Sequence, residues 1–122
     1  MIKPMLAAAF LVVSVAAHAM PVSTFVTKAN ALEKKGMMAL FSSDFKLLKN
    51  EGNTATQAAV REERAAVKTG RKPTMCFPAN NKLSLGTSEV LNHMRAVPAA
   101  QRGMSVKEAM AGLLRKKYPC AG

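Results

Sequence analysis

The two cysteines, Cys76 and Cys120, are the feature that most constrains how this chain can fold. They are the only cysteines in the sequence, so a single intramolecular pairing exists. In an oxidising compartment we expect them to form a disulfide. Closing a loop of about 45 residues stabilises a fold by about 4 kcal/mol in the chain-entropy treatment. The alternative role, a catalytic thiol, needs a histidine base, and beyond residue 19 the sequence offers only His93.

The N-terminus has the pattern of a secretory signal peptide. Lys3 supplies a positive charge, residues 5–16 are almost wholly apolar, and Ala17-His18-Ala19 has the small-x-small form that signal peptidase requires. About a dozen apolar residues are too few to cross a bilayer, which takes roughly twenty. We therefore expect residues 1–19 to be removed near Ala19, and the rest to work in the periplasm or outside the cell. The alternative is an N-terminal helix buried in the domain.

Residues 20–122 are enough for one domain with a single core. The formal charge of the whole chain is +11, and removing Lys3 leaves +10. Such a charge concerns partners and solubility, and it does not determine the fold. Export and the lack of alternating basic and aromatic residues argue against a nucleic-acid partner. An acidic protein or an anionic envelope surface fits better, and a generally basic, solvated surface is the remaining alternative.

Apolar periodicity, glycine and proline divide residues 20–122 into helices, with no convincing strand. The predicted fold class is therefore all-α, a small bundle of four to five helices. The predicted segments are 23–36, 37–50, 54–68, 87–96 and 105–118. Ser23 is the expected N-cap of the first, which buries Phe25, Ala29 and Leu32.

The boundaries of the third and fifth segments rest on capping patterns. Asn50-Glu51-Gly52-Asn53 reads as a turn, and Thr54-Ala55-Thr56-Gln57 after it has the spacing of a capping box. The thin apolar stripe of 54–68 predicts a peripheral helix that Gly70 ends. Ser105-Val106-Lys107-Glu108 is a second capping box, before the clearest apolar stripe of the chain.

Methionine and phenylalanine recur every three to four residues in the second segment, at Met37, Met38, Phe41 and Phe45. This spacing predicts a core-facing stripe, although Ser42-Ser43-Asp44 leaves open whether 37–50 is one helix or two. Thioethers are soft metal ligands, which raises a copper site as an alternative. We expect instead that Met38, Met94 and Met110 fill gaps in the core.

The fourth and fifth helices are joined by the short connection 98–103, so we expect them to lie antiparallel. The start of one then neighbours the end of the other. Because Cys76 precedes the first and Cys120 follows the second, a disulfide would clasp the open end of this hairpin, residues 76–120.

No catalytic, cofactor or metal constellation is evident in the sequence. A lone helical histidine such as His93 is usually exposed or hydrogen-bonded. The acidic residues are scattered, and adjacent Glu62 and Glu63 point to different sides of a helix, where we expect them to pair with Arg61 and Arg64. We therefore expect a binding protein with no cofactor and not an enzyme.

A sparse set of residues in the C-terminal half resembles the Rap/Tai family of periplasmic immunity proteins, which protect bacteria against type VI secretion amidase toxins. The matching residues are Cys76, Pro78, Val97, Pro98, Tyr118, Pro119 and Cys120. Family members often carry a further cysteine in the N-terminal half, and residues 20–75 have none. The resemblance implies a small helical periplasmic protein that binds a toxin, such as a peptidoglycan amidase, and occludes its active site.

Binding contacts are expected from the loop that the disulfide holds, because recognition often lies on loops over a rigid scaffold. The candidate residues are Lys68, Arg71, Lys72, Asn80, Asn81 and Lys82. Two other functions remain open: a periplasmic stress chaperone, for which the chain has few carboxylates to protonate, and a basic protein that binds the envelope surface. The sequence does not determine the oligomeric state.

Overall fold

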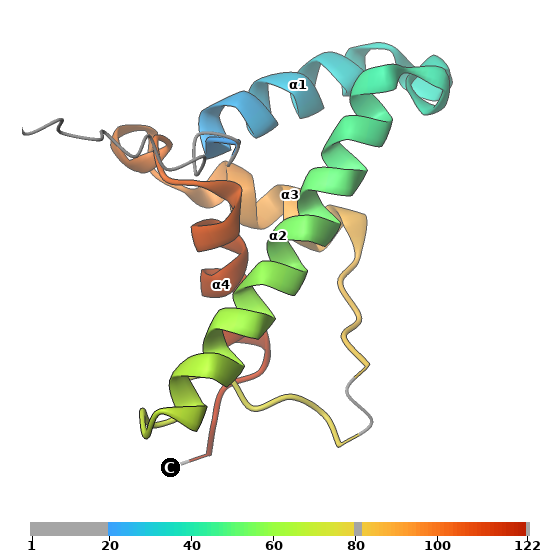
Figure 1. Ribbon diagram of the computed structural model, residues 1–122. Coiled ribbons are helices and arrows are strands. Elements are labelled where there is room, and N and C mark those ends of the chain that lie inside the picture. Colours follow the sequence, from blue (N-terminus) through green and yellow to red (C-terminus); the bar gives the residue numbers. More distant parts are fainter. Residues whose placement is uncertain (1–19, 80–81, 122) are drawn as a thin grey trace, which may run out of the picture.

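The computed structural model describes residues 20–79 and 82–121, and within these ranges the chain is all-α, as the sequence predicts (Figure 1). The helices are α1 (Val22–Lys34), the 3-10 helix η2 (Gly36–Phe41), α2 (Ser43–Lys68), α3 (Thr87–Ala96), the 3-10 helix η3 (Ala99–Gln101) and α4 (Val106–Lys117). The predicted signal peptide and the candidates Asn80 and Asn81 lie outside the described residues. No helix in the described ranges combines the length and apolarity that a membrane span needs.

The long helix α2 runs along the whole fold, and α1 and α4 pack against it (Figure 1). It packs most extensively against α4, while α1 meets its N-terminal end at an angle through η2 and α3 lies between α1 and α4. The main core lies between these four helices. Its most deeply buried side chains are Val22, Phe25, Val26, Ala29, Ala55, Met94, Val106, Ala109, Met110 and Leu113. A smaller cluster of Ala59, Met75 and Leu114 continues the core toward the C-terminal end of α2.

The predicted turn at residues 50–53 is wrong, because α2 continues without interruption from Ser43 to Lys68. The capping box expected at Thr54 is absent as well: the hydroxyl of Thr56 donates to the carbonyl of Gly52, 2.7 Å away, within the helix. Glycine in a helix costs about 1 kcal/mol relative to alanine. The buried positions Leu48, Ala55 and Ala59 keep helical spacing across this segment, so packing outweighs the weak local propensity.

Helix α2 is also central, whereas its second half was predicted to be peripheral. Its buried residues Ala55 and Ala59 have small side chains, and α4 packs along this side of the helix. A thin stripe of alanines thus marks close helix packing here and not a lack of partners. The true N-cap is Ser42, whose hydroxyl accepts from the backbone N–H of Asp44 at 3.2 Å.

The segment 37–50 is two elements, and Ser42 separates them. Residues 36–41 form η2, which buries only Ala39. The prediction that the methionines and Phe41 face the core is wrong here: Met38 is 68% exposed and Phe41 83%. Met94 and Met110, by contrast, are almost fully buried, as predicted.

Helix α1 begins at Val22, and its N-cap is Pro21 and not Ser23. Backbone carbonyls from a distant segment satisfy the first donors of this helix: Val22 N donates to Met104 O and Ser23 N to Arg102 O, both at 2.9 Å. A side-chain cap is therefore unnecessary. Local sequence patterns do not predict a helix start that is capped by carbonyls of residues 102 and 104. The predicted buried face of α1 is confirmed.

In the C-terminal half the limits of α3 and the cap of α4 agree with the prediction. Helix α3 spans Thr87–Ala96, and the hydroxyl of Ser105 accepts from Glu108 N at 3.1 Å at the start of α4. Lys117 at the end of α4 pairs with Glu89 at the start of α3, with 2.8 Å between Nζ and Oε2. The two helices nevertheless cross at a steep angle, so the antiparallel arrangement that we expected is wrong (Figure 1). His93 donates from Nε2 to the carbonyl of Ala109, 2.8 Å away.

Candidate functional site

The connection between α2 and α3, residues 69–86, contains or adjoins all the predicted binding candidates. Regular hydrogen-bonded structure is absent from most of its described part. Three sets of contacts nevertheless fix it to the helices: the carboxylate of Glu63, the disulfide, and side chains at the end of α4. We call its middle part, residues 77–84, the clasped loop.

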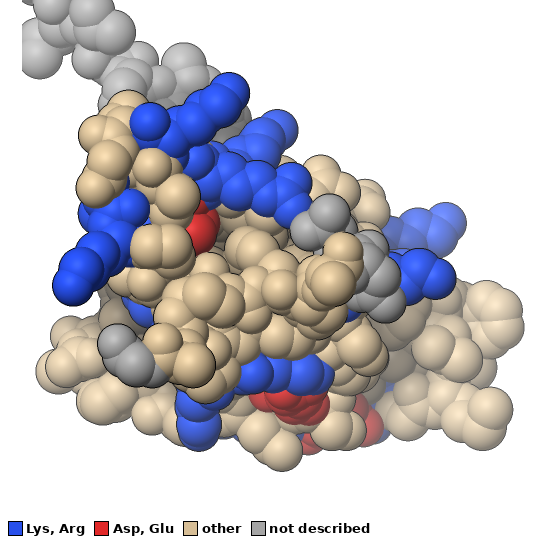
Figure 2. Space-filling model, turned by 90° about the horizontal axis from the view of Figure 1, so that it is seen from below, with Lys and Arg blue, Asp and Glu red and all other residues tan. Residues whose placement is uncertain are grey.

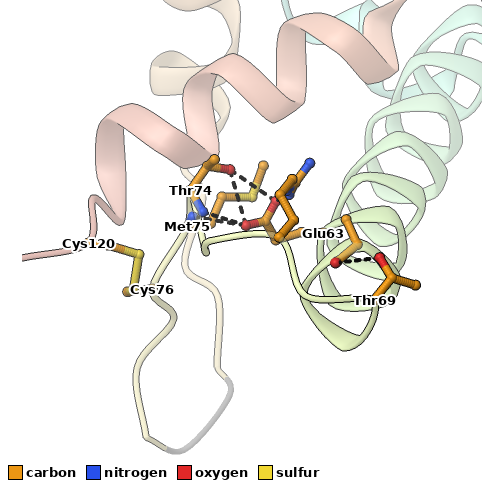
Figure 3. Close-up of polar contacts among 8 residues, drawn as sticks. Glu63, Thr69, Thr74, Met75, Cys76 and Cys120 are labelled. Atoms are coloured by element: carbon orange, nitrogen blue, oxygen red, sulfur yellow. Dashed lines mark hydrogen bonds and ion pairs between the residues drawn. A yellow bond between two sulfur atoms is a disulfide. The ribbon is translucent and has the colours of Figure 1, made fainter.

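Glu63 fixes the first part of the connection (Figure 3). This carboxylate lies on α2 and is 4% exposed, the one buried charged side chain among residues 20–79 and 82–121. It accepts from the backbone N–H of Thr74 at 2.6 Å and of Met75 at 3.2 Å, and from the hydroxyl of Thr74 at 2.9 Å. The guanidinium of Arg71 also donates a hydrogen bond to this carboxylate. One buried carboxylate thereby holds three residues of the connection against α2.

These donors determine the protonation of Glu63. Burial by itself raises the pKa of the carboxyl group, but the hydrogen bonds from Thr74, Arg71 and Met75 together outweigh burial and hold the pKa below its ordinary value of 4.5. The carboxylate therefore stays charged at neutral pH although it is buried. Its satisfied donors make the contact a stable anchor and not a site of proton transfer.

The disulfide fixes the next residue of the connection. Cys76 and Cys120 are joined, with 4.9 Å between their Cα atoms, as predicted (Figure 3). The backbone N–H of Cys76 also donates to the carbonyl of Tyr118 at 2.8 Å. The rings of Phe77 and Tyr118 meet edge to face, 6.0 Å between centroids. Residues 76 and 77 are thus held to the residues that follow α4 by a covalent bond, a backbone hydrogen bond and a ring contact.

The far end of the clasped loop is held by α4. Ser84 N donates to the hydroxyl of Tyr118 at 3.1 Å, and the ammonium of Lys117 donates to Ser84 O. Lys117 also binds Glu89, and this hydrogen bond, with help from Gly86 N, lowers the pKa of that carboxyl group despite partial desolvation. Both ends of the clasped loop are therefore anchored at the C-terminus of α4.

Two adjoining hollows lie between α2 and the anchored connection. The first has a volume of about 420 Å³ and is lined by Thr56, Gln57, Val60, Arg61, Arg64, Phe77 and Leu83. The second has a volume of about 310 Å³ and is lined by Glu63, Arg64, Val67, Lys68, Pro73, Met75, Cys76 and Phe77. Arg64 and Phe77 belong to both linings, so the hollows are neighbours, and together we call them the α2 groove.

The α2 groove combines an apolar lining with a basic edge. Val60, Val67 and Phe77 supply apolar surface, and Arg61, Arg64 and Lys68 supply positive charge from successive turns of α2. Figure 2 views the molecule from the end that carries the connection and the C-terminus of α2, and Lys and Arg side chains outnumber acidic ones on this face. Such a surface favours an acidic segment that carries an apolar side chain.

The predicted candidates have different roles in this arrangement. Lys68 lines the α2 groove, and Lys72 and Lys82 are exposed on the connection. Arg71 is half-exposed but its guanidinium binds Glu63, which gives it a structural role. The acidic pair Glu62 and Glu63 have partners that the sequence did not suggest: Glu62 pairs with Lys107 of α4, 2.6 Å away, and Glu63 with Arg71.

Arg61, Arg64 and Phe77 were not among the predicted binding residues. In the sequence Arg61 and Arg64 looked like internal partners of neighbouring glutamates. Arg61 and Arg64 line the first hollow together with Phe77 and Leu83 of the clasped loop. The sequence did contain one signal for this arrangement. Arg61 and Arg64 are three positions apart, and this spacing places both on one face of a helix.

Comparisons of the chain with protein-family models, with characterised proteins and with solved structures give no significant match.

Proposed function

We propose that this chain is an exported helical binding protein that recognises an acidic protein surface through the α2 groove and the clasped loop. In this proposal it acts as the Rap/Tai immunity proteins do, by occluding the active site of a cell-wall amidase toxin. The observation that supports it most is the basic depression between α2 and a loop whose two described ends are anchored. The sparse family resemblance at Cys76, Pro78, Tyr118, Pro119 and Cys120 supplies the toxin class.

A loop that is already ordered before binding can bind a partner more tightly than a flexible one. A loop that orders only on binding loses conformational entropy at that moment, and this cost lowers the affinity. Glu63, the disulfide and Tyr118 already hold the connection in place. The described ends of the clasped loop, residues 77–79 and 82–84, are then in place before a partner binds, and Arg61 and Arg64 add positive charge beside them.

The contacts of Met20 support the proposal that residues 1–19 are removed. Met20 is the first residue after the expected cleavage site, and it is already part of the fold. Its carbonyl accepts from Val106 N at 2.8 Å, and its backbone nitrogen lies 3.2 Å from Oε1 of Glu51. After cleavage this nitrogen would be an ammonium group beside a carboxylate, which favours the processed N-terminus.

The test is inhibition of a purified periplasmic peptidoglycan amidase, with binding measured by calorimetry. Charge reversal in the double variant Arg61→Glu/Arg64→Glu should lower the affinity at least about 30-fold, because both new carboxylates repel an acidic partner. The double variant Arg115→Glu/Lys116→Glu is the matched control, since it changes the charge equally and lines neither hollow. Equal loss in both variants, or no amidase bound by the wild type, would overturn the proposal.

A further inference from the structure

Large apolar side chains are exposed at one corner of the molecule, far from the α2 groove. Met37 is 82% exposed, Met38 68%, Leu40 54%, Phe41 83% and Leu47 43%. Val67 is the one other large apolar side chain exposed to a similar degree in the described ranges. We call these five residues of η2 and the start of α2 the apolar corner. Figure 1 shows η2 at the outer bend where α1 gives way to α2.

The geometry of η2 produces this exposure. A 3-10 helix has three residues per turn, so residues three apart lie above one another. Ala39 faces the core, and the other two sides of η2 carry Met37 with Leu40 and Met38 with Phe41. A regular α-helix over the same residues would have turned part of this set inward. The fold therefore presents two short apolar columns to the outside.

The charges around the apolar corner are positive. Lys34 and Lys35 precede η2, and Lys46 and Lys49 follow on the first turns of α2, all four exposed. The neighbouring acids are engaged elsewhere: Glu33 binds Arg95 at 2.7 Å, and Asp44 binds Lys28 at 3.3 Å. Among residues 20–79 and 82–121, none of the four lysines forms an ion pair.

We propose that the apolar corner is a docking surface for an anionic lipid bilayer. Phe41, Leu40 and the two methionines enter the boundary between headgroups and acyl chains, while the lysines contact anionic headgroups. The convex bend suits a flat, deformable bilayer better than a structured protein cleft. A second copy of this chain is disfavoured as the occupant, because pairing two corners would bring four unpaired lysines against four others. This surface is independent of the α2 groove.

A single tryptophan reports on the corner directly, because the natural chain contains no tryptophan. Phe41→Trp in the full chain is mixed with vesicles of phosphatidylglycerol and phosphatidylcholine, and with vesicles of phosphatidylcholine alone. The proposal expects a blue shift and quenching by brominated acyl chains with the anionic vesicles only. Val67→Trp, at the opposite end of α2, is the matched reporter and should show neither effect. Because the apolar residues 1–19 can themselves insert into a vesicle, both reporters are also made in residues 20–122, where the difference between them should persist.

Charge variants test the lysines by vesicle flotation. Each basic residue near an anionic surface contributes roughly fivefold to binding, so Lys34→Gln/Lys35→Gln should lower the partition coefficient about 25-fold. Arg115→Gln/Lys116→Gln carries the same charge change at the end of α4 and should leave the blue shift of Phe41→Trp in place. Equal shifts from both tryptophan reporters would overturn the proposal, because binding would then be unoriented. A blue shift of Phe41→Trp in buffer without vesicles would also overturn it, in favour of self-association.

Discussion

At the scale of single residues, Glu63 shows how one carboxylate can determine the path of a loop. Its partners are eight to twelve residues away, and they belong to a segment with little regular structure. Removing a buried charge that is fully hydrogen-bonded leaves donors without a partner, and that cost exceeds the value of any one contact. The residue is therefore an anchor for the whole connection between α2 and α3.

Glu63 also predicts an acid dependence of stability. Its pKa is lower in the fold than in the unfolded chain, so the unfolded chain binds more protons once the pH falls toward 4.5. The stabilisation is complete above that value and is lost as the pH falls through the lower, folded pKa. Urea unfolding of the wild type between neutral pH and pH about 3 should show this loss.

Glu63→Gln should lower the free energy of unfolding at neutral pH by about 1–3 kcal/mol, because an amide accepts fewer hydrogen bonds than a carboxylate. The same variant should lose less stability than the wild type on acidification. Glu108→Gln, at an exposed position on α4, is the control, and it should follow the wild-type pH profile. Parallel profiles for wild type and Glu63→Gln would show that the carboxylate does not cause the acid sensitivity.

At the scale of elements, the continuity of α2 through Gly52 distinguishes the structure from the sequence-based expectation. An added Cβ at Gly52 would meet no heavy atom within 4 Å. Gly52→Ala should therefore raise the free energy of unfolding by about 0.5–1 kcal/mol, because alanine loses less backbone entropy in a helix. Chemical denaturation followed by circular dichroism measures the change.

Gly70→Ala is the matched comparison. Gly70 ends α2 with a φ of +104°, a backbone conformation that alanine adopts only under strain, so this variant should be destabilised. A turn at residues 50–53 would predict no gain from Gly52→Ala, and a neutral or unfavourable effect would contradict a continuous helix.

At the scale of the whole molecule, the disulfide joins the two ends of the C-terminal segment 76–120. It links the connection after α2 to the last residues after α4, which are 44 positions apart. Because Glu63 and Tyr118 fix the same segment independently, the bond reinforces a shape that non-covalent contacts already favour. Its loss should affect the connection more than the core between α1, α3 and α4.

Cys76→Ser/Cys120→Ser should lower the free energy of unfolding by up to about 4 kcal/mol, the cost of the released loop. Hydrogen exchange should rise most in residues 71–86 and at the end of α4, while α1 and α3 keep most of their protection. A uniform increase over the chain would contradict a local anchoring role. Reduction of the wild type with dithiothreitol should reproduce the pattern.

Much of the C-terminal half could be predicted because its determinants are local. Ser105 caps α4 through a residue three positions on, and Pro119 ends that region. Two cysteines allow one pairing, whereas the angle between α3 and α4 depends on how they pack against the other helices. The same reasoning gave no sign that Arg61, Arg64 and Phe77 line hollows beside the connection.

The amino-acid sequence by itself determined the helical class, the limits of α3, the cap of α4 and the disulfide, because each depends on residues close in the chain or on a unique pairing. Tertiary structure decided the rest. Packing of Ala55 and Ala59 beside α4 carries α2 through Gly52, and Thr74 and Met75 reach Glu63 only in the folded chain. The outward direction of Met37, Met38 and Phe41 follows from a 3-10 turn at the bend after α1. For α2 and for the connection after it, contacts between distant segments outweigh local preferences of about 1 kcal/mol per residue.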